Sequence, residues 1–183
     1  MGLPVVARIA GNDEWLAPAE TRANAVLSAS VGRFSTTMAR VGLALIAVAR
    51  NDVSAAEEQY TALVSVPGIM VFYVTPDHVL GLLSVTLGRL DQAMNHFEDS
   101  LEFCRKAGYR PNLAWTCHDY AHALLQRSGT GDREKAMYLL DESLAISTEL
   151  GMRPLIKRAQ DRLDRIGTTA PETPNYPSGL SQR

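Results

Sequence analysis

The sequence predicts an all-α superhelix of about three helix pairs, with a leading helix before them and a capping helix after them. Two observations carry this prediction: a block of residues recurs along the chain, and the apolar residues of each copy follow the three- and four-residue steps of one helix face. A third is the placement of Gly, Asn and Pro between the copies, where helices end and begin.

The repeat is clearest between residues 93–111 and 136–154, where matching residues lie 43 positions apart, from Ala93 and Ala136 to Pro111 and Pro154. A fainter copy lies 37 residues upstream of the first, beginning at Ala56. In order, the apolar period and the turn residues predict a leading helix at 17–31, pairs at 37–49/53–65, 77–87/91–106 and 112–127/133–149, and a last helix at 154–166.

The turns within the pairs carry residues suited to them. Asn51, Gly88 and Gly131 tolerate the left-handed conformation that ends a helix, and Asp52 and Asp132 are expected to cap the helix that follows. Gly108 and Gly151 end the second helices, and Pro111 and Pro154 suit a first helical turn.

These elements divide the chain into three parts. Residues 1–16 are an N-terminal extension, 17–166 the repeat domain (pairs 37–65, 77–106 and 112–149, cap 154–166), and 167–183 a Pro-rich tail with no apolar period. The connection at 65–76 is apolar, and we expect it to pack back over a helix pair; a ligand lid or a partner contact is the alternative.

Each copy places a small residue midway along its first helix, an Ala in its second helix, and an aromatic or Leu four residues later. The three sets are Ala44/Ala56/Tyr60, Gly81/Ala93/Phe97 and Ala121/Ala136/Leu140. The small residues are expected where two helices approach closely, because a larger side chain there would overpack the contact. This pattern resembles the tetratricopeptide repeat, and its spacing of 37 to 43 residues is similar to the longer-helix variety of MalT-like regulators.

A closer resemblance covers residues 76–166, which are similar to the repeat region of large bacterial signalling proteins that also contain an ATPase or a nucleotide cyclase. Residues 176–183, YPSGLSQR, resemble the opening of a LuxR-type DNA-binding domain. The resemblance implies a protein-interaction or ligand-sensing segment of an ATP-dependent LuxR/MalT-like transcriptional regulator. A free-standing adaptor and the repeat region of an adenylate or guanylate cyclase or an AAA-type ATPase are the alternatives.

Composition and motifs favour binding over catalysis. With 18 Lys and Arg against 20 Asp and Glu, the net charge of −2 gives no positive field for nucleic acid or an anionic membrane. The sequence contains no phosphate-binding loop, GxGxxG, GxSxG or paired-Cys zinc motif, so we expect no enzyme activity, cofactor or metal. With only two cysteines and no recognisable targeting segment, we expect a cytoplasmic chain. His118 and His122 share a helix face but lack a third ligand, and Cys104 and Cys117 are expected to be inert core thiols rather than a redox pair.

The repeat register predicts which residues line a concave groove. They are Met38, Val41, Leu45 and Val48 in the first copy, Thr75, His78, Leu82 and Val85 in the second, and Trp115, His118, His122 and Gln126 in the third. The groove is expected to hold a protein, a peptide or a small inducer. Plain packing of Trp115 and solvated histidine tips are the alternative.

The last helix is amphipathic, with Arg and Lys around an apolar stripe, and is expected to close the stack with its polar face outward. Phosphate binding by this polar face is a lesser alternative. Exposed terminal helices also allow a homodimer.

Overall fold

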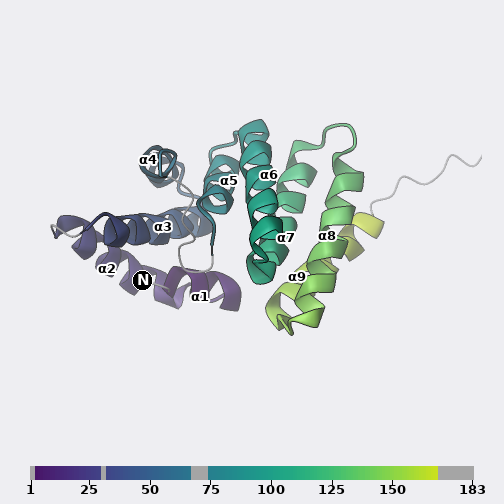
Figure 1. Ribbon diagram of the computed structural model, residues 1–183, viewed down its shortest axis with the longest axis horizontal. Coiled ribbons are helices and arrows are strands. Elements are labelled where there is room, and N and C mark those ends of the chain that lie inside the picture. Colours follow the sequence, from purple (N-terminus) through teal and green to yellow (C-terminus); the bar gives the residue numbers. More distant parts are fainter. Residues whose placement is uncertain (1–2, 30–31, 67–73, 169–183) are drawn as a thin grey trace, which may run out of the picture.

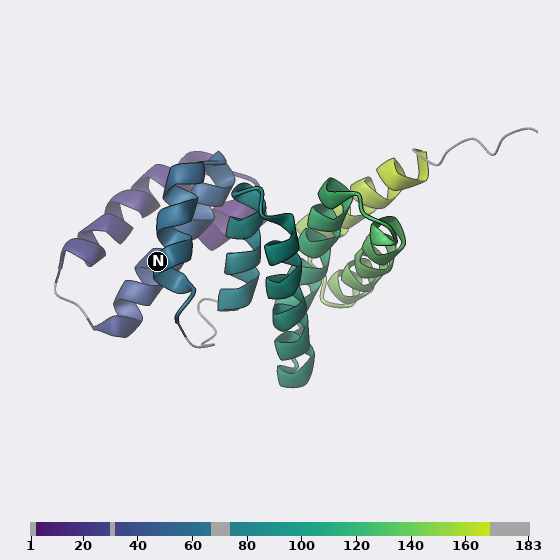
Figure 2. The same cartoon turned by 90° about the horizontal axis from the view of Figure 1, so that it is seen from above.

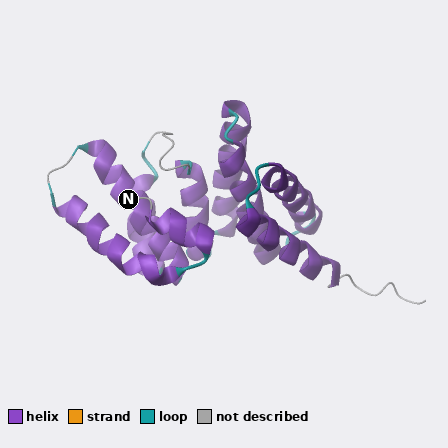
Figure 3. Cartoon of the chain, turned by 90° about the horizontal axis from the view of Figure 1, so that it is seen from below, coloured by secondary structure: helices purple, strands orange, loops and turns teal. Residues whose placement is uncertain are grey.

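The computed structural model describes residues 3–29, 32–66 and 74–168, and within these ranges the chain is built from helices without strands (Figure 1; Figure 3). The all-α prediction is confirmed. The helices are α1 (Leu3–Ala10), a short 3-10 turn (Asp13–Trp15), α2 (Leu16–Ser28), α3 (Arg33–Arg50), α4 (Val53–Leu63), α5 (Pro76–Thr86), α6 (Leu90–Ala107), α7 (Arg110–Arg127), α8 (Asp132–Glu149) and α9 (Arg153–Thr168).

The helices pack consecutively into a superhelix. Within the hairpins α3 packs on α4, α5 on α6 and α7 on α8, and successive hairpins meet through α4 and α5, through α6 and α7, and finally through α8 and the capping helix α9. The first helices α3, α5 and α7 also touch one another in sequence. Figure 2 shows α5, α6, α7 and α8, coloured from blue-green to green, following one another along the long axis in chain order.

Left-handed residues end the helices that the sequence marked. Asn51 (φ 52°), Gly108 (φ 72°) and Gly151 (φ 67°) adopt this conformation, and the Asp52 side chain accepts a hydrogen bond from the Ala55 amide. Asp132 differs from the prediction, because Gly131 is the N-cap of α8 and the Asp132 carboxylate instead accepts from the Gly129 amide in the preceding turn.

The predicted packing residues all lie in the core. The six small residues and their larger partners are buried, and they are Ala44, Ala56, Tyr60, Gly81, Ala93, Phe97, Ala121, Ala136 and Leu140. Phe97 is fully buried and stacks on Tyr120 with ring centroids 5.4 Å apart. This ring lies directly against the backbone of Gly81, so the α5/α6 contact depends on the missing side chain.

The largest difference from the sequence prediction is at the N-terminus. The extension at 1–16 was expected to lie outside the helical domain, but it contains α1, which packs on α2, α3 and α9. Helix α3 begins at Arg33, one turn before the predicted start at 37, and α9 continues to Thr168, beyond the predicted end at 166. Most of the apolar connection (67–73) and nearly all of the tail (169–183) lie outside the described residues.

None of the helices in the described ranges combines the length and the hydropathy needed to cross a bilayer.

The contact between Gly81 and Phe97 generates a prediction with a matched control. A Cβ atom at Gly81 would lie 2.7 to 3.0 Å from three atoms of the buried Phe97 ring. We expect Gly81→Ala to lower the free energy of unfolding by about 1–2 kcal/mol, because overpacking exceeds the gain in helix propensity. The measurement is urea unfolding followed by circular dichroism.

Gly42→Ala is the control, because Gly42 is also inside a helix but its Cβ would meet only Pro4, at an ordinary 3.7 Å. We expect that variant to be unchanged or more stable by up to about 1 kcal/mol. Equal effects of the two substitutions would contradict the proposed role of Gly81.

Candidate functional site

The concave face that the repeat register predicts is covered by the chain's own helix α1. Most of the predicted lining is buried, and this group comprises Val41, Leu45, Thr75, His78, Leu82, Trp115 and His118, while Met38, Val48 and Val85 are half-buried and His122 and Gln126 are exposed. In Figure 1, α1 lies along the stack between α3 and α9. The groove is therefore occupied, and of its three predicted histidines His78 and His118 are buried whereas His122 is exposed.

Three side chains of α1 face the groove. Val5 packs on the hydrophobic core, and Val5, Arg8 and Ile9 line a common cavity with Leu45 and Trp115. Residues 5, 8 and 9 share one helix face because they are three and four positions apart. Val6 points away and is 52% exposed, so the short helix is amphipathic.

The C-terminal end of α1 is held by the capping helix α9. Arg158 donates to the carbonyl oxygen of Arg8 at 2.8 Å, and a carbonyl at the end of a helix has no partner within that helix. This contact joins residues 150 positions apart, and with a longer bond from Arg158 to the Ile9 carbonyl oxygen at 3.4 Å it links the first and last helices of the stack. The polar face of α9 thus turns partly inward at Arg158, whereas the sequence predicted that it faces outward.

Asp119 of α7 is the centre of the site. Its Oδ2 atom accepts from Arg8 and from His78 Nε2 at 2.7 Å, and its Oδ1 atom accepts from His118 Nδ1 at 3.1 Å. The donors come from α1, α5 and α7, so one carboxylate connects three helices. Because a buried carboxylate is stable only when its charge is balanced and hydrogen-bonded, these partners are required once Asp119 is buried.

The ionisation of Asp119 follows from these contacts. Burial alone would raise its pKa, but the Arg8 charge and the hydrogen bonds from His118 and His78 outweigh burial and hold the pKa well below its usual value. The carboxylate is therefore ionised at neutral pH, and its negative charge balances the Arg8 guanidinium.

A chain of buried polar groups continues from Asp119 into the stack. The other ring nitrogen of His78 lies 3.3 Å from both Asn112 Oδ1 and Thr116 Oγ1, and the Thr116 hydroxyl is 3.2 Å from that of Ser100. The Ser100 hydroxyl is in turn 2.7 Å from that of Thr75 at the start of α5. Buried polar networks of this kind specify one arrangement of the helices that share them.

Two arginines lie against the Trp115 ring. The guanidinium carbons of Arg8 and Arg158 each lie 5.2 Å from its ring centroid, within the range of a cation–π interaction. Trp115 is only 8% exposed, so α1 and α9 cover it in the closed groove.

Helix α1 does not fill the groove completely. A cavity of about 200 Å³ remains beneath it, lined by Val5, Arg8, Ile9, Leu45, Val74, His78, Pro111, Asn112, Trp115 and Met152. Most of these side chains are apolar, so the space suits larger hydrophobic groups than Val5 and Ile9 provide.

The described residues bring one set of metal-ligand types together elsewhere, with ligand atoms of Asp77, His96 and Asp99 within 4.8 Å of one another. His118 and His122, which share a helix face, are not part of a ligand set of that kind within the described ranges. Cys104 and Cys117 are both buried and free, and burial raises the pKa of the Cys104 thiol, as expected for unreactive core residues.

Sequence reasoning missed Arg8 and Asp119, the two charges that organise the site. One signal was present: Arg8 sits on the same face as Val5 and Ile9, and Asp119 is the only acidic residue in helix α7. Each residue could be recognised in the sequence as a charge within an apolar pattern. Their pairing across 111 positions could not be predicted in this way.

Comparison with known proteins gives no relative: no family model, no curated protein and no solved structure matches this chain.

The buried carboxylate generates a stability prediction. We expect Asp119→Asn to lower the free energy of unfolding at pH 7 by about 3–5 kcal/mol, because Arg8 loses the charge that balances it and His78 and His118 lose an ionised acceptor. Since the pKa of Asp119 is depressed in the folded state, its contribution is complete above about pH 4 and is lost as the pH falls towards the folded-state pKa.

Unfolding curves at several pH values test both parts, with Asp141→Asn as the control at an exposed position of α8. The difference between wild type and Asp119→Asn should shrink below pH 4, whereas the control should match wild type throughout. A small and pH-independent difference would show that Asp119 does not hold the site together.

Proposed function

We propose that this chain is a protein-interaction module of the tetratricopeptide-repeat type whose concave groove binds a helical segment of a partner protein. The observation that carries the proposal is α1 itself, a short amphipathic helix seated in the groove through one arginine and an apolar stripe. A groove that accepts a helix of the same chain has the shape and chemistry to accept one from another chain. The proposed activity is binding, without a chemical reaction.

The groove chemistry specifies the partner segment. Asp119 and Trp115 favour an arginine, since a guanidinium can bond a carboxylate and lie over an aromatic ring together. Leu45 and the cavity beneath α1 favour an aliphatic or aromatic side chain three or four residues from that arginine. We therefore propose a partner helix with an arginine and a bulky apolar residue one turn apart.

In this proposal α1 is an internal competitor. A segment joined to the groove through a short connection has an effective concentration on the order of millimolar, so a free partner must bind more tightly or α1 must leave first. The unfilled cavity gives a partner with larger side chains an advantage.

The wider context that we propose is a LuxR/MalT-like transcriptional regulator. It rests on the sequence, in the repeat landmarks of 76–166 and the residues 176–183, which lie outside the described residues. In such a regulator, occupancy of the groove would bias the arrangement of attached domains.

A peptide competition experiment tests the groove. In a full-length variant with Val5→Asp and Arg8→Glu, α1 should leave the groove, because one substitution places a charge in an apolar cavity and the other opposes Asp119. We expect a fluorescent peptide copying residues 3–12 to bind this variant at least tenfold more tightly than it binds the unmodified chain. Fluorescence anisotropy is the measurement.

The matched control is Val6→Asp with Arg22→Glu, which makes the same changes at exposed positions of α1 and α2. This control should bind the peptide no better than the unmodified chain does, and a peptide with the Arg8→Glu change should fail to bind either. Equal binding of the peptide by both double variants would mean that the groove does not select this helix.

A further inference from the structure

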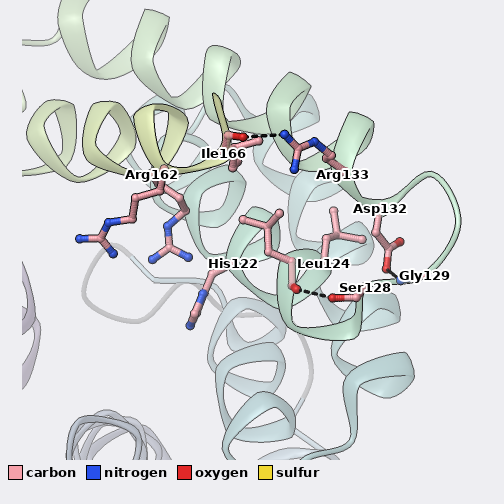
Figure 4. A pocket seen from close by; sticks show the side chains of 10 residues that line it. His122, Leu124, Ser128, Gly129, Asp132, Arg133, Arg162 and Ile166 are labelled. Atoms are coloured by element: carbon pink, nitrogen blue, oxygen red, sulfur yellow. Dashed lines mark hydrogen bonds between the residues drawn. The ribbon is translucent and has the colours of Figure 1, made fainter. Parts of the chain in front are cut away.

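A second cavity lies apart from the groove beneath α1, at the C-terminal end of the stack. Its volume is about 570 Å³, it is open to solvent, and it is lined by the end of α7, the first turn of α8 and the last turns of α9. The lining residues are His122, Leu124, Leu125, Ser128, Gly129, Asp132, Arg133, Arg162, Arg165 and Ile166. Figure 4 shows Arg162 and His122 on one side of this pocket and Arg133 and Asp132 on the other.

Two arginines of this pocket, Arg133 and Arg162, have no acidic partner among the lining residues. Asp132 is the single carboxylate of the lining. That carboxylate already accepts from Arg127, at 2.9 and 2.6 Å, and from the Gly129 amide at 2.8 Å. Asp132 is therefore paired with Arg127 and the turn, and within the described residues no hydrogen bond joins it to Arg133 or Arg162.

Arg162 is the clearest case. No hydrogen bond or ion pair joins its guanidinium to another residue of the described ranges, although the side chain is half-buried. Burial lowers its pKa, the Asp119 charge opposes that change, and the neighbouring charge of Arg165 adds to it. A cation that is partly removed from water without a partner costs stability, so its position calls for a bound anion.

The neighbouring side chains suit the same ligand. Arg133 donates one N–H to the Ile166 carbonyl oxygen at the end of α9, which fixes its side chain at the pocket edge and leaves its other donors available (Figure 4). Protein around the His122 ring and the Arg162 charge lower the pKa of His122 to about 4, so it is neutral at pH 7 and offers a hydrogen bond rather than a charge.

Part of the pocket wall is apolar. Leu124, Leu125 and Ile166 line the pocket beside the arginines, and its volume falls within the range of about 300–1,000 Å³ typical of small-molecule sites. The guanidinium fork matches phosphate oxygens, and a phosphate monoester carries close to two negative charges at pH 7.

We propose that this pocket binds a small organic phosphate monoester, with Arg162 and Arg133 holding the phosphate and the leucine wall holding the organic group. This site is separate from the helix-binding groove, and it stands whether or not the groove binds a partner.

Calorimetric titration of the full chain with phenyl phosphate, at constant ionic strength, tests the proposal. Phenyl phosphate should bind, and benzoate and inorganic phosphate should each bind more weakly, because one lacks the phosphate and the other lacks the organic group. Arg162→Gln should weaken phenyl phosphate binding at least tenfold. Arg153→Gln, at an exposed position of the same helix outside the pocket, should leave it unchanged.

Equal losses in the two variants, or no binding of phenyl phosphate at millimolar concentration, would overturn the proposal. Thermal unfolding provides a second readout that separates a ligand site from a structural arginine. Without ligand, Arg162→Gln should raise the melting temperature, since it removes an unpartnered charge, and phenyl phosphate should raise that of wild type only. A lower melting temperature for Arg162→Gln would identify Arg162 as structural and reject the site.

Discussion

A buried carboxylate at Asp119 is the constraint on which the arrangement of the site depends. Once the repeat register places this residue on the inner face of α7, its charge must be balanced within the protein, because water does not reach it freely. The hydrogen-bond donors to Asp119 are His78 of α5, His118 of α7 and Arg8 of α1. The N-terminal helix is thus held by an electrostatic requirement of the third hairpin, and its apolar contacts add to that attachment.

The stack itself could be predicted from the sequence because its signals are local. Apolar residues three and four positions apart define each helix, and left-handed Asn51, Gly108 and Gly151 mark helix ends where they stand. The close approach of Gly81 to Phe97 also follows from a repeated spacing of small and aromatic residues. Each of these inferences uses neighbours in sequence, or a period that the chain repeats.

The covered groove could not be predicted in the same way. Leu45, His78 and Trp115, which the register predicts on one side of the stack, line one cavity, but whether that side is open depends on the pairing of Arg8 with Asp119 across 111 positions. Eight residues are too few for a helical period to be recognised with certainty, and an isolated helix of that length is unstable without tertiary contacts. Helix α1 depends on tertiary contacts with α2, α3 and α9 as well as on the Asp119 carboxylate, so its presence is a property of the fold as a whole.

The two proposed sites share one electrostatic field, which gives any coupling between them a definite sign. The Asp119 charge acts on Arg162, but its oxygens are already bonded to Arg8 and the two histidines. With Arg8 in place, the negative charge of Asp119 is largely neutralised. Arg162 can therefore bind an external anion. Departure of α1 would remove Arg8 and restore that negative charge, which would weaken the binding of an anion to Arg162. By thermodynamic reciprocity, a bound anion would favour the state with α1 in the groove. A phosphate ligand would therefore keep the groove closed. A partner helix with an arginine at Asp119 would preserve the affinity of the pocket for an anion, whereas a neutral partner would lower that affinity.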